Sequence, residues 1–274
     1  MLEKLRYKNH INETLDFGID KLFVNENDLR DFAWSVTSKN DKISGFKKGI
    51  VSKTVPIIIK CDTEAEGFEM RNKLFEVFEK DVLSQKYGKF IIGDYYLKCY
   101  VTGSTKAEYL FSKKYMRIDL AVQTDYPEWV KETTTAFRGN TDNNSEFLDY
   151  TYDFPIDYKN SYTGNSINNS NFVASNFRMV FYGKVENPTI FIDGHEYSVA
   201  VNVAVGEYLT IDSVEKTVIL TKNNGEKVNC FNLRNKNAYI FEKIPSGTLV
   251  VTTANEGLYF DITLLEERSE PKWI

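Results

Sequence analysis

The chain has 274 residues, of which 42% are hydrophobic, and it carries 34 Lys and Arg against 39 Asp and Glu, a net charge of -5. This length suits one large or two medium domains with real cores. The small acidic charge and the lack of a long basic run argue against stable binding of nucleic acid through its phosphates. The N-terminus has no uninterrupted apolar stretch, so we expect no secretory signal, no membrane insertion and synthesis in a cytoplasm.

The first half predicts strands. Apolar residues alternate with polar ones at 55–61 and at 116–122, as expected for strands with one buried face. Gly93-Asp94 separates two alternating segments within 91–101, which predicts a hairpin. Aromatic residues make up 14% of the chain, and this content also favours β structure.

One helix is expected, from about residue 64 to 83. It begins with a capping-box pattern at Thr63 and Glu66, in which each side chain can satisfy a free backbone donor. Its apolar residues are expected to form one broad arc lying on a sheet: Phe68, Met70, Leu74, Phe75, Val77, Phe78 and Val82. On this interpretation, Phe75→Asp should unfold the N-terminal half.

A change of composition predicts a domain boundary near residue 135. Residues 139–145 are polar and offer little to bury. We therefore expect an N-terminal domain at 1–135 and a C-terminal domain at 136–274. A second Asn-rich stretch at 160–171 predicts a long loop after a short strand around residues 150–154.

The second half consists of strand and turn signals. Residues 197–205 and 259–264 alternate between apolar and polar. Turn signals separate the strands at Asp193-Gly194, Asn223-Asn224-Gly225, Pro245-Ser246-Gly247 and Glu256-Gly257. The predicted fold class is mainly β (α+β): a β-sandwich-like N-terminal domain with one amphipathic helix, then an antiparallel β-sandwich.

The sequence offers little material for catalysis. It has two histidines, His10 and His195, and His195 is expected beside a turn. Glycine-rich phosphate loops and the Gly-x-Ser-x-Gly elbow are missing. The calcium-like pattern at 142–146 has Phe147 where a glycine is needed. We assign no catalytic, cofactor-binding or metal-binding residues and no cofactor, so the protein is not expected to be an enzyme.

The cysteines and tryptophans are interpreted as packing residues. Cys61, Cys99 and Cys230 fall in strand-like runs and are expected to be inert core thiols. Trp129 and Trp273 each follow a strand-like run and are expected to pack at domain edges. Two of the many carboxylates could lie close enough for glycoside hydrolysis, an alternative that the sequence leaves open.

Seven short segments occur in a fixed order along the two halves of the chain. In the first half they are the Trp34-Ser35-Val36 strand, the Val55-Pro56-Ile57-Ile58 strand before the helix, and Tyr126-Pro127-Glu128-Trp129. In the second half they are Asn187-Pro188-Thr189-Ile190-Phe191-Ile192, Gly206-Glu207-Tyr208-Leu209-Thr210-Ile211-Asp212, Phe231-Asn232-Leu233-Arg234 and Lys243-Ile244-Pro245-Ser246-Gly247.

In this order, the segments resemble a known family, the distal tail proteins of long-tailed bacteriophages (siphophages). The resemblance implies a structural hub (baseplate) subunit in the virion, at the tail tip, that assembles in the host cytoplasm. Such proteins form a ring, commonly a hexamer, through their N-terminal domains, and their C-terminal domain is galectin-like or carbohydrate-module-like. The implied partners are the tail tube protein, the tape measure and the tail-tip or receptor-binding proteins. We hypothesise that the strands at 55–61 and 116–122 support the ring interface.

The main alternative is a carbohydrate-binding or adhesion module of a phage or bacterial surface assembly. A β-sandwich with exposed Tyr and Trp side chains can bind glycans, including saccharides of the host cell wall. Glycan binding by residues 140–274 alone would favour this alternative.

Overall fold

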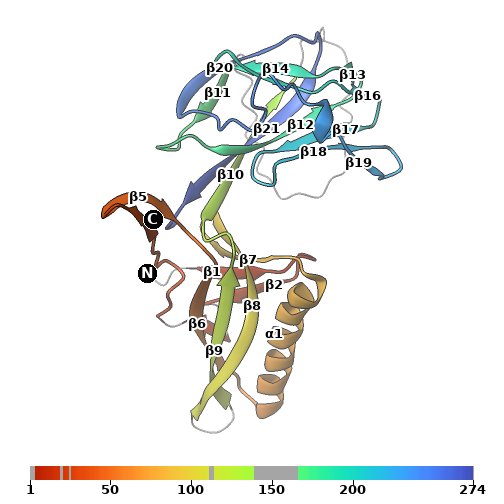
Figure 1. Ribbon diagram of the computed structural model, residues 1–274. Coiled ribbons are helices and arrows are strands. Elements are labelled where there is room, and N and C mark those ends of the chain that lie inside the picture. The colour runs from red at the N-terminus through yellow and green to blue at the C-terminus, as the bar shows by residue number, and fades with distance from the viewer. Residues whose placement is uncertain (1–3, 19–20, 25, 111–113, 139–165, 274) are drawn as a thin grey trace. The chain divides into compact units, whose positions relative to one another are not determined.

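A computed structural model describes residues 4–18, 21–24, 26–110, 114–138 and 166–273 (Figure 1). The fold is mainly β, as predicted, with one long helix in the first half. The chain divides into two compact units: unit 1 comprises residues up to Lys131 together with those from Glu267 onward, and unit 2 comprises Glu132–Glu266. In the described ranges, no helix has both the length and the apolar character needed to cross a membrane.

Unit 1 contains two antiparallel groups of strands that share one long strand. Its strands are β1 (Leu5–Lys8), β2 (Thr14–Phe17), β3 (Leu22–Val24), β4 (Ser35–Lys39), β5 (Lys42–Lys47), β6 (Val51–Lys60), β7 (Gly88–Ile92), β8 (Tyr95–Leu110) and β9 (Tyr115–Thr124). The first part of β8 continues the order β2-β1-β7, and its later part pairs with β9, which is followed by β6 and β3. The predicted hairpin is confirmed, because Ile92 lies opposite Tyr95 across the Gly93-Asp94 turn.

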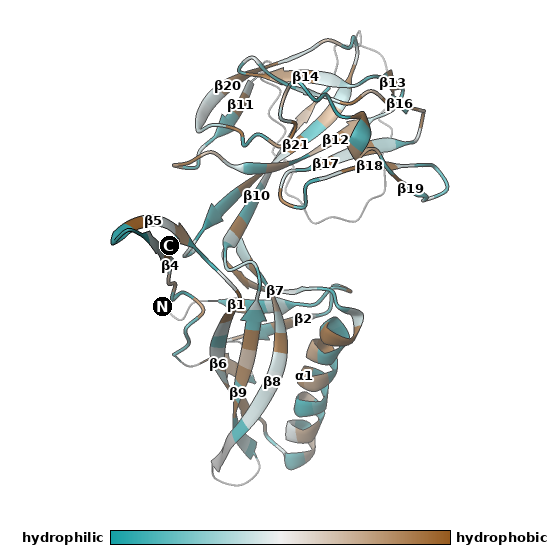
Figure 2. Cartoon of the chain, viewed as in Figure 1, coloured by the Kyte–Doolittle hydropathy of each residue, from teal (hydrophilic) through white to brown (hydrophobic). Residues whose placement is uncertain are grey.

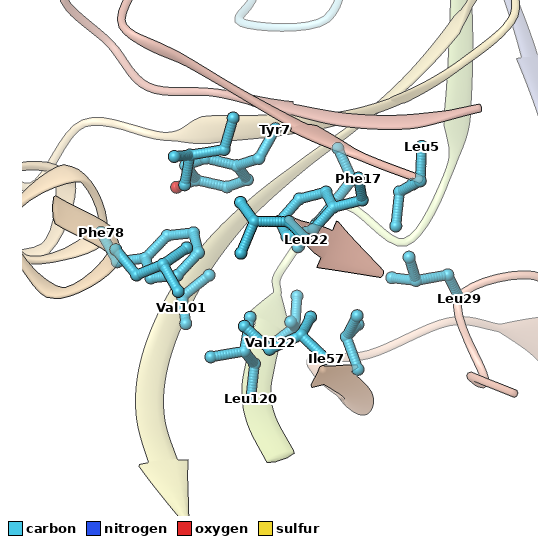
Figure 3. Close-up of a cluster of buried hydrophobic side chains, with 14 of the residues drawn as sticks. Leu5, Tyr7, Phe17, Leu22, Leu29, Ile57, Phe78, Val101, Leu120 and Val122 are labelled. Atoms are coloured by element: carbon cyan, nitrogen blue, oxygen red, sulfur yellow. The ribbon is translucent and has the colours of Figure 1, made fainter. Parts of the chain in front are cut away.

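The core of unit 1 confirms the two alternating patterns. The predicted apolar residues of β6 and β9 are 5% exposed or less, and Figure 3 shows several of them beside side chains from β1 and the helix. The Tyr7 ring contacts Phe78 and Phe90 edge-to-face, with centroids 4.8 and 5.0 Å apart. Strands far apart in sequence therefore meet the helix in one cluster.

Helix α1 (Glu64–Ser84) starts where the capping pattern predicts. The Thr63 side chain accepts a hydrogen bond from the Glu66 backbone N–H, and the Glu66 carboxylate accepts one from the backbone N–H of Asp62. The helix ends at Gln85, which has left-handed backbone angles (φ 51°).

The prediction that one apolar arc of α1 is buried is only partly right. Leu74, Val77 and Phe78 are buried, but Phe68 and Phe75 are 44% and 62% exposed. The helix contacts β8 and β6, which lie along one side of it, so an arc as broad as the predicted one cannot be covered completely. The expectation that Phe75→Asp unfolds the N-terminal half is therefore wrong.

A buried carboxylate fixes α1 to the first strands. Asp81 is fully buried and accepts hydrogen bonds from the Tyr7 hydroxyl (2.5 Å) and the His10 backbone N–H (2.9 Å), and it contacts His10 Nδ1 (2.5 Å). Burial raises the pKa of Tyr7 far above its usual range, and the nearby Cys99 and Asp81 contribute to this rise. A Cβ on Gly88 would lie 1.9 Å from the Tyr7 hydroxyl oxygen, so this contact requires a glycine.

Unit 2 is an antiparallel β-sandwich. Its strands are β11 (Ser166–Asn169), β12 (Asn176–Tyr182), β13 (Val185–Glu186), β14 (Thr189–Ile192), β15 (His195–Ser198), β16 (Asn202–Val203), β17 (Tyr208–Asp212), β18 (Thr217–Thr221), β19 (Lys227–Asn229) and β20 (Gly247–Thr253). Strands β10 (Trp129–Phe137) and β21 (Tyr259–Arg268) contain the division between the units. The order β19-β18-β17-β12-β21 forms one sheet and β11-β20-β14-β15 the other, and residues of both sheets share one core.

The turns of unit 2 lie where the sequence predicts them, but two segments differ from their predicted structure. Turns join β14 to β15 at Asp193-Gly194 and β18 to β19 at Asn223-Asn224-Gly225. The alternating run 197–205 is not one strand, because Val199 bonds to Pro188 and Ala200 to Leu233 between the short strands β15 and β16. The loop expected at 160–171 contains strand β11. The strand expected at 150–154 lies outside the described residues.

The three cysteines are free and buried, as predicted. Burial raises the pKa of Cys99 well above its usual value, so its thiol stays protonated. Trp129 also packs as expected, since it is 1% exposed. Trp273 agrees only in part with its expectation, because one face of its ring packs on Arg30 but the side chain as a whole is 75% exposed.

Candidate assembly interface

A two-stranded hairpin projects from unit 1. It consists of β4 and β5, and we call residues 34–48 the hairpin arm (Figure 1). Asn40 and Asp41 form a two-residue turn with φ angles of 52° and 57°. Such left-handed angles are typical of a tight turn that suits strand twist, and Asn and Asp tolerate them better than most residues. The local sequence therefore accounts for the hairpin.

One face of the hairpin arm is apolar. The strand register places Val36 opposite Phe46 and Ser38 opposite Ile43, so the three apolar side chains lie on the same face. They are 55–63% exposed. Figure 2 shows hydrophobic residues on β5 although it lies away from the core sheets of unit 1. An apolar face of this kind on an isolated element indicates a binding surface.

The hairpin arm has no core of its own. Gly45 is half-buried and every other residue of β4 and β5 is exposed, and among the described residues the two strands pair only with each other. An isolated two-stranded hairpin is marginally stable in water. Burying each large apolar side chain would contribute roughly 1.5–3 kcal/mol. The arm therefore gains most of its stability when another surface covers its apolar face.

The end of the hairpin arm is held in place by Lys48. Its ammonium group lies 2.8 Å from both carboxylate oxygens of Glu128 and donates to the Ser269 hydroxyl at 2.6 Å. The same group lies 4.4 Å from the centre of the Trp34 ring, at the start of the arm. The Lys48 side chain is 6% exposed, so this ion pair is shielded from water. These contacts tie both ends of the arm to unit 1.

The loop before the hairpin arm is also fixed. Lys53 donates to the backbone carbonyls of Asp28 (2.7 Å) and Asp31 (2.5 Å), and the Trp129 indole N–H donates to the carbonyl of Leu29 (3.2 Å). Burial lowers the pKa of Lys53, and the nearby carboxylates of Asp28 and Asp31 act in the opposite direction. The arm thus projects from a rigid base.

The C-terminal segment packs beside this base. Arg30 donates to the carbonyl of Pro271 (2.8 Å), and its guanidinium carbon lies 3.9 Å from the centre of the Trp273 ring. This cation–π contact covers one face of the Trp273 ring.

The strands at 55–61 and 116–122 have a mixed outward side. Their buried apolar side chains fill the core, whereas Lys60 and Ala121 are exposed and Pro56 and Ile58 are half-buried. A contribution of these strands to an interface would therefore come from this mixed side. Their role in the interface stays a hypothesis.

The two histidines considered for chemistry are held by contacts within the fold. His10 contacts the buried Asp81, and His195 Nε2 lies 3.0 Å from the carbonyl oxygen of Tyr239. The calcium-like pattern at 142–146 lies outside the described residues.

The apolar face of the hairpin arm was missed in the sequence, although its signal was present. The strand at Trp34-Ser35-Val36 was recognised, but the Asn40-Asp41 turn and the second strand were not. Asn-Asp between two short segments with apolar residues is a hairpin signal. What the sequence does not show is that none of the described strands covers the hairpin.

Comparison with known proteins gives the fold. No model of a known protein family matches the sequence, and no curated protein matches it. One match is the solved structure of Dit (gp 19.1) of phage SPP1, which is described as a paradigm of the hub adsorption apparatus in phages that infect Gram-positive bacteria. It has a TM-score of 0.59 and 11% identity, and the match covers 96% of this chain and 99% of the other.

Chains of the phage P2 baseplate in its activated conformation match as well. The structure with calcium has a TM-score of 0.60 and 11% identity, covering 99% of this chain and 100% of the other. The structure with strontium has a TM-score of 0.57 and 11% identity, covering 96% and 98%. Over nearly its whole length, this chain has the fold of phage hub and baseplate proteins.

Proposed function

We propose that this protein is a structural distal tail subunit of a long-tailed phage, which assembles into a ring at the tail tip. The observation that carries the proposal is the hairpin arm, whose apolar face is exposed on a rigid base in unit 1. The fold of a phage hub protein over nearly the whole chain supports it.

The exposed apolar face of the hairpin arm fits a ring of copies. An arm that contacts a different surface on the next copy, without that copy's own arm returning to the first, gives a head-to-tail interface. Head-to-tail contacts generate closed rings when the rotation between copies closes. The proposal includes a hexamer formed by the N-terminal domain (1–135), with the C-terminal domain (136–274) available to other tail proteins.

In this proposal the ring joins the tail tube to the tip or adhesion apparatus. Its partners are the tube protein, the tape measure and the tail-tip or receptor-binding proteins, and the site of action is the phage tail tip after assembly in the host cytoplasm. The protein contributes no catalysis. A net charge of -5 suits a channel that lets DNA pass without retaining it.

Light scattering coupled to size-exclusion chromatography, together with negative-stain microscopy of the purified protein, tests the proposal. We expect a ring with a central hole, and its mass gives the number of subunits. The variant Ile43→Asp/Phe46→Asp should be monomeric with an unchanged circular dichroism spectrum, because both side chains are exposed in the single chain. A strict monomer of the native protein at high concentration and at several salt levels would refute the ring.

Glycan binding by unit 2 is a second candidate, favoured by one aromatic side chain. Tyr239 is 54% exposed, and the Lys216 ammonium lies 5.5 Å from the centre of its ring. Exposed aromatic rings are suitable platforms for sugar faces. A glycan array probed with the native protein and with Tyr239→Ala tests this candidate, and binding that depends on Tyr239 would support it.

A further inference from the structure

We propose that the hairpin arm of one copy docks on an exposed apolar stripe of helix α1 in a second copy of this chain. The helix stripe consists of Phe68, Phe75 and Leu83, which are 44%, 62% and 76% exposed. This inference rests on the proposed self-assembly and names the surface that receives the arm.

The helix stripe is continuous along one side of α1. Spacings of seven and eight residues correspond to about two helical turns, so the three side chains follow one another on one side. Leu74, Val77 and Phe78 lie on the other side and are buried in unit 1. The helix therefore has two apolar faces, and its own unit covers one of them.

The dimensions of the two surfaces match. Phe68 and Leu83 are 15 residues apart, which corresponds to about 22 Å along a helix. The six residues of β5 extend about 20 Å. The arm is therefore long enough to cover the stripe from end to end.

The hairpin arm cannot cover the helix stripe of its own chain. In Figure 1 the arm leaves unit 1 on one side of the strands and α1 lies on the other side. Within its unit, α1 packs mainly on β8 and β6, and Asp81 joins it to Tyr7 and His10. A second copy is the occupant that brings an arm to this face.

Charge complementarity supports the same pairing. Apart from Lys48, which is paired with Glu128, the hairpin arm carries three exposed lysines and one aspartate, a net charge of +2. Apart from the buried Asp81, helix α1 carries five acidic and three basic residues, a net charge of -2. Glu69 and Glu76 directly follow the two phenylalanines of the stripe. Opposite charges around two apolar faces orient the partners and suppress other pairings.

A complementation experiment tests this pairing. The arm-disabled variant is Ile43→Asp/Phe46→Asp, and the stripe-disabled variant is Phe75→Asp/Leu83→Asp. Each contact needs one intact arm and one intact stripe, so each variant alone should be monomeric. An equimolar mixture should form a heterodimer and stop there, since one arm and one stripe remain usable. Light scattering and analytical ultracentrifugation measure the masses.

Single substitutions measure how much each side chain contributes to self-association. Phe46→Asp or Phe75→Asp should weaken self-association by about 30-fold or more, as for a central residue of an interface. Val205→Asp is the control, because Val205 is 67% exposed but lies in unit 2, and it should assemble like the native protein. The heterodimer should weaken as salt is raised, since opposite charges border both surfaces.

The outcomes separate the two proposals. A stripe-disabled variant that assembles like the native protein, or a mixture that stays monomeric, overturns the docking of arm on stripe while the ring itself stands. A native protein that is monomeric overturns the ring and with it this inference. Circular dichroism and thermal melting of each variant test whether the fold is kept. We expect it to be kept, because all four substituted side chains are exposed.

Discussion

The molecule contains two hairpins with similar turns and opposite surroundings. The hairpin arm turns at Asn40-Asp41, and the β14–β15 hairpin of unit 2 turns at Asp193-Gly194, each through two residues with positive φ. In β14–β15 the apolar side chains Ile190, Ile192 and Tyr197 are 1% exposed or less, whereas Val36, Ile43 and Phe46 of the arm are more than half exposed.

Neighbouring strands explain the difference. Strand β14 also pairs with β20, and its apolar face lies in the core between the two sheets of unit 2. The strands of the hairpin arm have no further neighbour among the described residues. A turn sequence and a few apolar residues are thus sufficient for a hairpin, but its environment decides whether the apolar face stabilises the chain itself or binds a partner.

The largest expected effect comes from truncating one aromatic residue in each hairpin. The Tyr197 ring packs edge-to-face on Phe177 with centroids 5.3 Å apart, and its hydroxyl donates to the carbonyl of Glu242 at 2.9 Å. Tyr197→Ala should therefore lower the free energy of unfolding by about 3–5 kcal/mol. Phe46→Ala should change it by less than about 0.5 kcal/mol, measured by urea unfolding at a concentration where copies are dissociated. Similar losses in both variants would contradict the comparison.

The same contrast can be tested on two adjacent residues of α1. Leu74 is 3% exposed and Phe75 is 62% exposed. Leu74→Ala should lower the free energy of unfolding by about 2–5 kcal/mol, whereas Phe75→Ala should leave it within about 0.5 kcal/mol in dissociated protein. Thermal melting with circular dichroism measures both. A large loss for Phe75→Ala would mean that its side chain packs inside unit 1.

The smallest effect is expected at the exposed start of α1. A hydrogen bond from Lys21 lowers the pKa of Glu66 below its ordinary value of 4.5. A lowered pKa in the folded state means that the pair stabilises the fold above pH 4.5 and that this contribution disappears as the pH falls through the lowered value. Glu66→Gln should therefore melt slightly below the native protein at pH 7 and together with it at pH 3. A difference that persists at pH 3 would show that the ion pair is not its cause.

The sequence predicted the elements whose patterns are local. The strands at 55–61 and 116–122, the capped start of α1 and the turns at Gly93-Asp94 and Asp193-Gly194 were confirmed, because alternation and turn chemistry act over a few residues. The prediction that residues 197–205 form one strand was wrong, because hydrogen bonds to residues distant in sequence divide this segment.

The candidate interface was less predictable, because exposure depends on what remains uncovered after folding. The broad apolar arc from Phe68 to Val82 on α1 indicated that the helix could have two apolar faces. The pattern could not show which of these faces lies against the strands. Phe75 was therefore assigned to the core, and the apolar face of the hairpin arm was not recognised.

By itself, the sequence determined the β-rich class, the start of the helix and the tight turns, because these follow from side-chain periodicity and from backbone angles of single residues. Only the tertiary structure decided which apolar faces are buried. A face is buried when another element of the chain lies against it, and for the hairpin arm and the helix stripe none of the described elements does.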